Sequence, residues 1–150
     1  KAGDTMTGTL NLPSNGLAVG TNQLVASGTN VGIGTTTPGT KLDVQGQVRS
    51  RVYDAGASTS IDWSNGNVAY TSASCGAFTF SNMLEGGSYT LVVMGGTMGT
   101  CTFSQASPDV ISAGNFRFVP GNGATSPNKM TVYNMIRAGG FVFVNWSSGF

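Results

Sequence analysis

Aromatic residues are confined to one part of this chain, and that confinement limits how the rest can fold. Residues 1–52 contain none, whereas all fourteen (eight Phe, four Tyr and two Trp) lie in residues 53–150. A stretch without large side chains buries too little apolar area to offset about 1–2 kcal/mol of backbone entropy per residue. We therefore expect residues 1–52 to share an interior with other copies of the chain, and residues 53–150 to have a core of their own.

Within the aromatic-free part, residues 30–46 (NVGIGTTTPGTKLDVQG) have the pattern of two short strands joined by a turn. Val31 and Ile33 alternate with glycines. After a Thr-Thr-Thr-Pro-Gly corner, Leu42 and Val44 share one face by period-two alternation. Glycine inside a strand often marks close approach of another backbone. This thin apolar face predicts a β-rich segment that is interwoven with sister chains.

Two motifs in this region resemble the shafts of trimeric fibres. Residues 30–46 are similar to the VGIGTTxPxxKLxVxG segment of phage tail-fibre shafts and related bacterial fibres, and residues 1–12 (KAGDTMTGTLNL) are similar to the KAGDTMTGxL repeat of phage tail fibres. Residues 53–150 bear a weaker resemblance to fibre tips, including those of the mosaic adhesive trimer fibres of predatory bacteria. The resemblance implies an intertwined trimeric β-shaft over residues 1–52, followed by a β-sandwich tip over residues 53–150, in a homotrimer.

The resemblance also bears on where the protein works. The chain begins inside a repeat, so we expect it to be the C-terminal part of a longer protein, with any export signal upstream. Fibres of this kind are exported, and we expect this one to be extracellular, on the surface of a cell or a virion. The low content of charged residues, with abundant Gly, Ser, Thr and Asn, suits a β-rich surface of that kind.

Residues 53–150 contain short apolar or alternating runs separated by turns rich in Gly, Asn and Pro. This pattern is typical of an antiparallel β-sandwich of jelly-roll or TNF-like form. The dipeptide Asn65-Gly66 predicts a hairpin. Runs 89–94 and 141–146 are apolar on both faces, so we expect one face of each to meet the core and the other a neighbouring chain. The predicted strands are Ser58–Trp63, Val68–Ser72, Ala77–Ser81, Tyr89–Met94, Thr100–Ser104, Phe116–Val119, Met130–Ile136 and Phe141–Trp146.

The composition argues against several classes of function. Charged residues make up 9% of the chain and the net charge is +1, so we expect no nucleic-acid partner. No apolar run approaches the roughly 20 residues that span a bilayer, so we expect no membrane insertion. Histidine is absent, which removes histidine-based triads and histidine metal sites. We expect no cofactor and no metal.

The two cysteines, Cys75 and Cys101, both lie in the second part of the chain. In an exported β-protein we expect them to form a disulfide, which in the chain-entropy account contributes roughly 3–4 kcal/mol. The alternative is a pair of buried free thiols that pack as small apolar residues. Two cysteines are too few for a structural zinc site, which usually has four ligands.

Aromatic residues beside amides are the candidate ligand site. An aromatic ring can cover the apolar face of a sugar, while a few well-placed polar groups bond its hydroxyls. Core packing, an interface or an ordinary turn is the more common explanation for each of these residues. The loop Gly121–Lys129 is a further possible contact surface. The candidates are Trp63 with Asn65 and Asn67, Tyr133 with Asn134, Asn145 with Trp146, and Arg117 between two Phe.

The carboxylates give little support for an enzyme. Asp62 beside Trp63 is the best single candidate for a glycosidase acid, but the sequence shows no partner for it. We therefore expect a binding module without enzymatic activity: the receptor-binding tip of an adhesive fibre that attaches to a target cell, through a surface glycan. One alternative is a terminal domain that only nucleates and locks the trimer. The other is a polysaccharide depolymerase whose two carboxylates meet at a subunit interface.

Overall fold

A computed structural model describes residues 17–19, 24–119 and 121–150, and these residues form β-strands and two short 3-10 helices. The all-β prediction is therefore confirmed. The chain divides into two compact units, residues 1–49 and residues 50–150, close to the point where aromatic residues begin. The fibre-like motif at residues 1–12 lies outside the described residues.

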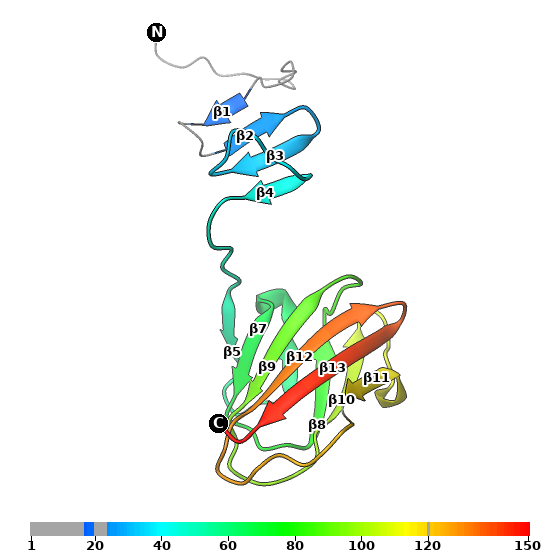
Figure 1. Cartoon of the computed structure of the whole chain (residues 1–150). Coiled ribbons are helices and arrows are strands. Elements are labelled where there is room, and N and C mark those ends of the chain that lie inside the picture. The colour runs from blue at the N-terminus through cyan, green and yellow to red at the C-terminus, as the bar shows by residue number, and fades with distance from the viewer. Residues whose placement is uncertain (1–16, 20–23, 120) are drawn as a thin grey trace. The chain divides into compact units, whose positions relative to one another are not determined.

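The first unit contains a sheet with the order β1-β2-β3-β4 (Figure 1). The Thr-rich corner does not fold β4 back against β3, because the two strands run in parallel. Gly34 shows why a glycine follows β3: its φ is 77°, and a Cβ there would lie 2.9 Å from the carbonyl oxygen of Gln45. The close backbone approach predicted from the glycines is thus made within one chain. The strands are Leu17–Val19 (β1), Leu24–Ser27 (β2), Asn30–Ile33 (β3) and Leu42–Val44 (β4).

One face of this first sheet is apolar and open. Ile33 pairs with Leu24 on one side and with Val44 on the other, and Val31 pairs with Leu42. Side chains at directly paired positions lie on the same face of a sheet. These five residues form what we call the unit-1 apolar face, and Leu42 on it is 61% exposed. A single copy of the chain therefore leaves this face uncovered within the described residues of the unit.

In the second unit, the described strands form two sheets (Figure 1). The small sheet has the order β10-β8-β6, and the large sheet has the order β11-β13-β12-β9-β7-β5. A 3-10 helix, Trp63–Asn65 (η1), follows β6, and a second, Ala113–Asn115 (η2), precedes β11. The strands are Val52–Asp54 (β5), Ser60–Asp62 (β6), Val68–Thr71 (β7), Ala77–Ser81 (β8), Ser88–Val93 (β9), Thr102–Ser107 (β10), Phe116–Val119 (β11), Thr131–Ala138 (β12) and Phe141–Ser148 (β13).

The strand directions correct the predicted antiparallel arrangement. Both pairings of the small sheet are parallel, as are β5–β7, β7–β9 and β11–β13, while β9–β12 and β12–β13 are antiparallel. From β5 to β10 successive strands alternate between the large and the small sheet. Each strand therefore pairs with the strand two places later in the sequence, such as β5 with β7 and β6 with β8. Parallel neighbours need such crossovers. Turn residues mark these crossovers as they would mark hairpins, and for that reason the jelly-roll prediction was wrong.

The predicted hairpin at Asn65-Gly66 is also wrong. Residues 63–65 form η1, which begins where the Asp62 carboxylate accepts a hydrogen bond from the backbone N–H of Ser64. Gly66 then has a φ of 153°, and a Cβ at this position would collide with the carbonyl oxygen of Arg51. The Asn-Gly pair therefore ends a helical turn and sends the chain from the small sheet to the large one.

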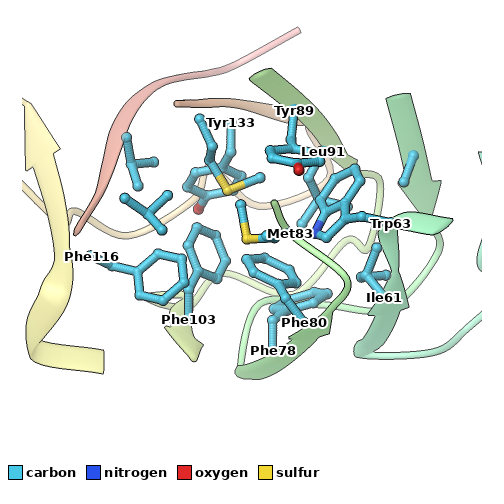
Figure 2. Close-up of a cluster of buried hydrophobic side chains, with 14 of the residues drawn as sticks. Ile61, Trp63, Phe78, Phe80, Met83, Tyr89, Leu91, Phe103, Phe116 and Tyr133 are labelled. Carbon is cyan, nitrogen blue, oxygen red and sulfur yellow. The ribbon is translucent and has the colours of Figure 1, made fainter. Parts of the chain in front are cut away.

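The two sheets share one hydrophobic core (Figure 2). Phe78 and Phe80 of β8 both point into it, as their alternation predicts, and Phe103 of β10 lies among the other rings. The ring centroid of Phe103 lies 5.1 Å from that of Phe80 and 4.9 Å from that of Tyr133 on the opposite sheet. Such offset and edge-to-face contacts add to the energy of burial.

A disulfide joins Cys75, in the loop before β8, to Cys101, just before β10, as predicted. The Cα atoms are 4.6 Å apart, and the two residues are separated by 26 positions in the sequence. The Tyr133 hydroxyl lies 3.4 Å from the Cys75 sulfur. Burial raises the pKa of Tyr133 to about 12, so the phenol stays neutral.

Candidate functional site

The large sheet has one face in the core and a second, outer face that carries the candidate site. Along β12, Tyr133 and Met135 are buried whereas Asn134 and Ile136 are exposed. The alternation continues in β13, where the exposed side chains include that of Phe143. Because successive residues of a strand point to opposite faces, the exposed residues of these strands lie together on the outer face.

Strand pairing brings amides next to apolar side chains on this face. Asn134 of β12 is paired directly with Asn145 of β13. Two residues further along β12, Ile136 is paired with Phe143. Phe143 is 49% exposed and Ile136 54%. On the other side of β12, Thr90 of β9 lies opposite Asn134 and donates a hydrogen bond of 3.0 Å to its Oδ1.

A groove of about 520 Å³ crosses these strands. Its apolar lining comes mainly from the aliphatic and aromatic side chains of the outer face, and its polar lining from amides and hydroxyls. No carboxylate or cation lines it among the described residues. The lining residues are Ser50, Asn67, Val68, Ser88, Tyr89, Thr90, Val119, Asn134, Met135, Ile136, Phe143, Val144 and Asn145.

The amides of the groove are only partly used by the fold. Asn67 donates from Nδ2 to the carbonyl oxygen of Ser88 at 2.8 Å, and Asn134 accepts from Thr90. Within the described residues no hydrogen bond engages the amide of Asn145, which is exposed. Donors and acceptors therefore remain free for a ligand: the Oδ1 of Asn67, the Nδ2 of Asn134 and the whole amide of Asn145.

Arg117 lies at the edge of this arrangement. It belongs to β11, is exposed, and is paired in register with Phe143 of β13. Its guanidinium carbon lies 5.0 Å from the centroid of the Phe141 ring, a cation–π contact. That contact holds the charge of Arg117 on the outer face, beside the apolar part of the groove.

The predicted aromatic candidates lie elsewhere. Trp63 is 4% exposed and its ring packs against those of Phe80 and Tyr89, at centroid distances of 5.6 and 5.0 Å (Figure 2). Tyr133 is completely buried, and Trp146 stacks on it at 6.2 Å while its Nε1 donates to the carbonyl oxygen of Gly121. Trp63 and Tyr133 therefore belong to the core, and Trp146 lies partly buried at its margin.

In the predicted aromatic–amide pairs, the ring and the amide do not act together. The amides of the outer face lie instead beside Phe143 and Ile136. Tyr133 with Asn134, and Asn145 with Trp146, are neighbours in one strand and point to opposite faces. Asn65 stays in the η1 turn, where its Nδ2 donates to the carbonyl oxygen of Asp62. Sequence reasoning missed Phe143 and Ile136, although the alternation within β12 and β13 was a signal that could have found them.

Trp63 and Asn67 still lie near each other. Both line a second hollow, of about 460 Å³, together with Asn82, Glu85 and Tyr89 among other residues. The Nε1 of Trp63 is buried and has no hydrogen-bond partner in the described residues. Asn67 lines both this hollow and the groove of the outer face.

The carboxylates are engaged in internal contacts. Asp109 accepts from the Nη2 of the buried Arg137 at 2.7 Å, and the Oε2 of Glu85 lies 3.5 Å from the Nε of the same arginine. Arg137 Nη1 also donates to the carbonyl oxygen of Met83. Asp62 accepts from Asn82 Nδ2 at 2.7 Å and from the Ser64 N–H, and these hydrogen bonds hold the pKa of its carboxyl below the ordinary value. Among the described residues, a depolymerase would have to use acids that already have hydrogen-bond or ion-pair partners.

A scan against protein-family models and searches of curated proteins and solved structures found no match to this chain. In the described residues, no helix is long and apolar enough to cross a bilayer. The same residues contain no group of three or more metal-ligating side chains of the His, Cys, Asp or Glu type.

Proposed function

We propose that this chain is the receptor-binding tip of a homotrimeric, extracellular adhesive fibre that attaches to a glycan on a target cell. The observation that carries the proposal is the groove on the outer face, where Phe143 and Ile136 lie beside the partly free amides of Asn67, Asn134 and Asn145. A sugar ring has apolar C–H faces and a rim of hydroxyls. An apolar surface with a few convergent polar groups matches both.

The remaining support comes from the first unit and from the sequence. Within the part of the unit that the structure describes, the unit-1 apolar face is uncovered, as expected if sister copies supply its partner surface. The fibre-like motif at residues 30–46 provides β3 and β4 of this sheet. A trimer presents three equal grooves, so a weak affinity for one sugar becomes useful avidity. The disulfide suits an oxidising compartment outside the cell.

Binding of the whole chain to immobilised glycans and to intact target envelopes tests this proposal. We expect binding that falls about tenfold or more in Phe143→Ala, which removes a stacking surface, and in Asn145→Ala, which removes hydrogen bonds. Thr36→Ala, an exposed loop residue of the first unit, is the matched control and should bind normally. Absence of binding to every glycan and every envelope would refute the adhesive function.

The capping alternative is favoured by one observation: Val119, Ile136, Phe141 and Phe143 leave much apolar surface on the outer face. If that face locked the trimer, Phe143→Asp would dissociate it, because a charge would enter a buried interface. In the adhesive proposal the same variant stays trimeric and loses glycan binding. Sedimentation velocity and glycan binding on one protein sample separate the two functions.

A further inference from the structure

The charges on the outer face are few and lie at opposite edges of the large sheet. Among the strand residues that alternation and register place on this face, Arg117 on edge strand β11 is the only cation, and Asp54 on the other edge strand, β5, is the only acid. Asp54 has internal partners: it accepts from the Gly56 N–H at 2.8 Å and interacts with Tyr70. Arg117 has no carboxylate partner in the described residues.

The position of Arg117 relative to the groove is set by two neighbours. It is paired with Phe143, which lines the groove, and it lies over Phe141, whose ring centroid is 6.5 Å from that of Phe143. Val119, two residues along β11, also lines the groove and is paired with Asn145. A sugar that packs against Phe143 therefore has the guanidinium on one side, toward Phe141, and Asn145 on the other.

Among the described residues, the groove lining itself carries no charged side chain. Its polar groups are amides, hydroxyls and backbone atoms, which suit sugar hydroxyls but do not select an ion. A guanidinium on an aromatic ring is pre-oriented and loses little freedom when it binds a planar anion with two parallel hydrogen bonds. A single cation matches the single charge of a carboxylate better than the nearly double charge of a phosphate monoester.

We propose that the groove takes an acidic saccharide, in which a uronic-acid-type carboxylate pairs with Arg117 while the sugar ring packs on Phe143 and its hydroxyls bond to Asn134 and Asn145. This inference rests on the proposed glycan-binding function and specifies its ligand class. It makes Arg117 the residue that distinguishes an acidic glycan from a neutral one.

The test compares matched ligands and matched variants of the whole chain by isothermal titration calorimetry. The ligands are an oligogalacturonate, the same oligomer with its carboxylates reduced to alcohols, and a phosphorylated oligosaccharide. We expect the oligogalacturonate to bind about 10- to 100-fold more tightly than the reduced form, the range for a hydrogen-bonded charge. Arg117→Gln should abolish that preference and Arg117→Lys should keep part of it. Lys41→Gln removes an exposed cation of the first unit that does not line the groove, and it should leave the preference unchanged.

The outcomes distinguish failure of this inference from failure of the proposed glycan-binding function. If the acidic and reduced oligomers bind equally and Phe143→Ala still weakens both, the carboxylate assignment is overturned and glycan binding stands. A preference for the phosphorylated sugar that is lost in Arg117→Gln would also overturn it. If none of these ligands binds and no other glycan or envelope does, both the inference and the proposed function fail. Circular dichroism of each variant confirms that it is folded.

Discussion

Asp62 links two segments of the second unit through its carboxylate. One oxygen accepts from the side-chain amide of Asn82 and from the backbone of Ser64. The hydrogen bond from Asn82 is the larger cause of the lowered pKa, and the bonds from Ser64 add to it. Because these bonds favour the ionised form, Asp62 stabilises the folded state only while it is deprotonated.

The sign of the resulting pH dependence is fixed. The contribution is fully present above the ordinary value of 3.8 and is lost as the pH falls from there through the lower pKa of the folded state. We expect urea unfolding of the wild type to lose more stability than Asp62→Asn between pH 5 and pH 2, since asparagine keeps an acceptor without a charge. Parallel curves for the two proteins would contradict this role.

Arg137 is the other residue whose removal should matter. Its guanidinium is buried and joins strand β12 to the carbonyl of Met83 and to the carboxylates of Glu85 and Asp109. Both carboxylates are more than half exposed, so they can return to water if the arginine is lost. The buried Met83 carbonyl would lose its charged donor and keep only the hydrogen bond of 3.4 Å from Gln105 Nε2.

We therefore expect Arg137→Met to lower the free energy of unfolding by about 1.5–3 kcal/mol, the contribution of a hydrogen bond to a charged group. Chemical denaturation of the full chain measures this cost. Arg117→Gln is the matched control, and as a surface change it should stay within about 0.5 kcal/mol of the wild type. Equal stability of Arg137→Met and the wild type would show that the buried cluster contributes nothing net.

At the scale of elements, the junction between η1 and β7 depends on Gly66. A side chain there would meet the Arg51 carbonyl, and the backbone has a φ of 153° that non-glycine residues rarely adopt. We expect Gly66→Ala to destabilise the protein by about 1–3 kcal/mol or more. Gly56→Ala is the comparison, because Gly56 has a positive φ of 58° but open space around it. Thermal unfolding should give a clearly lower midpoint for Gly66→Ala.

The disulfide joins the loop before β8 to the start of β10. Strands β8 and β10 pair in parallel, and β9 of the other sheet lies between them in the sequence. Closing a loop across 26 positions stabilises the folded state by roughly 3–4 kcal/mol in the chain-entropy account. We expect Cys75→Ala/Cys101→Ala to lose most of that amount in urea titrations. Reduction of the wild type should reproduce the loss, and it should not affect the double variant.

At the scale of the whole molecule, the open question is what covers the unit-1 apolar face. Burying one Leu or Ile side chain contributes about 1.5–3 kcal/mol, so a charge at such a position should prevent association. In the trimer proposal, Ile33→Asp converts the full chain from trimers to monomers at micromolar concentration. Thr40→Asp, exposed in the loop between β3 and β4, keeps the trimer. Sedimentation velocity decides this, and a monomeric wild type would contradict the proposal.

Much of the fold could be predicted because it depends on local patterns. The runs of alternating residues located β8 and β11 with their observed bounds, and β6, β7, β9, β10, β12 and β13 to within a few residues, whereas β5 was not predicted. The same alternation implied that Phe78 and Phe80 are buried together, and Cys75 and Cys101 were correctly paired. Period-two alternation and the scarcity of cysteine are visible in the chain itself and need no partner strand.

Strand direction and the composition of the groove depended on the tertiary structure. Alternation within each strand predicts that Asn134 and Asn145 point away from the core. Only the pairing of β12 with β13 places them opposite each other, beside Ile136 and Phe143. The parallel pairings arise because the chain crosses between sheets at each strand from β5 to β10, with crossovers of unequal length that leave no sequence repeat. Local chemistry specifies which face a side chain occupies, whereas its neighbours on that face are specified by contacts between residues far apart in the sequence.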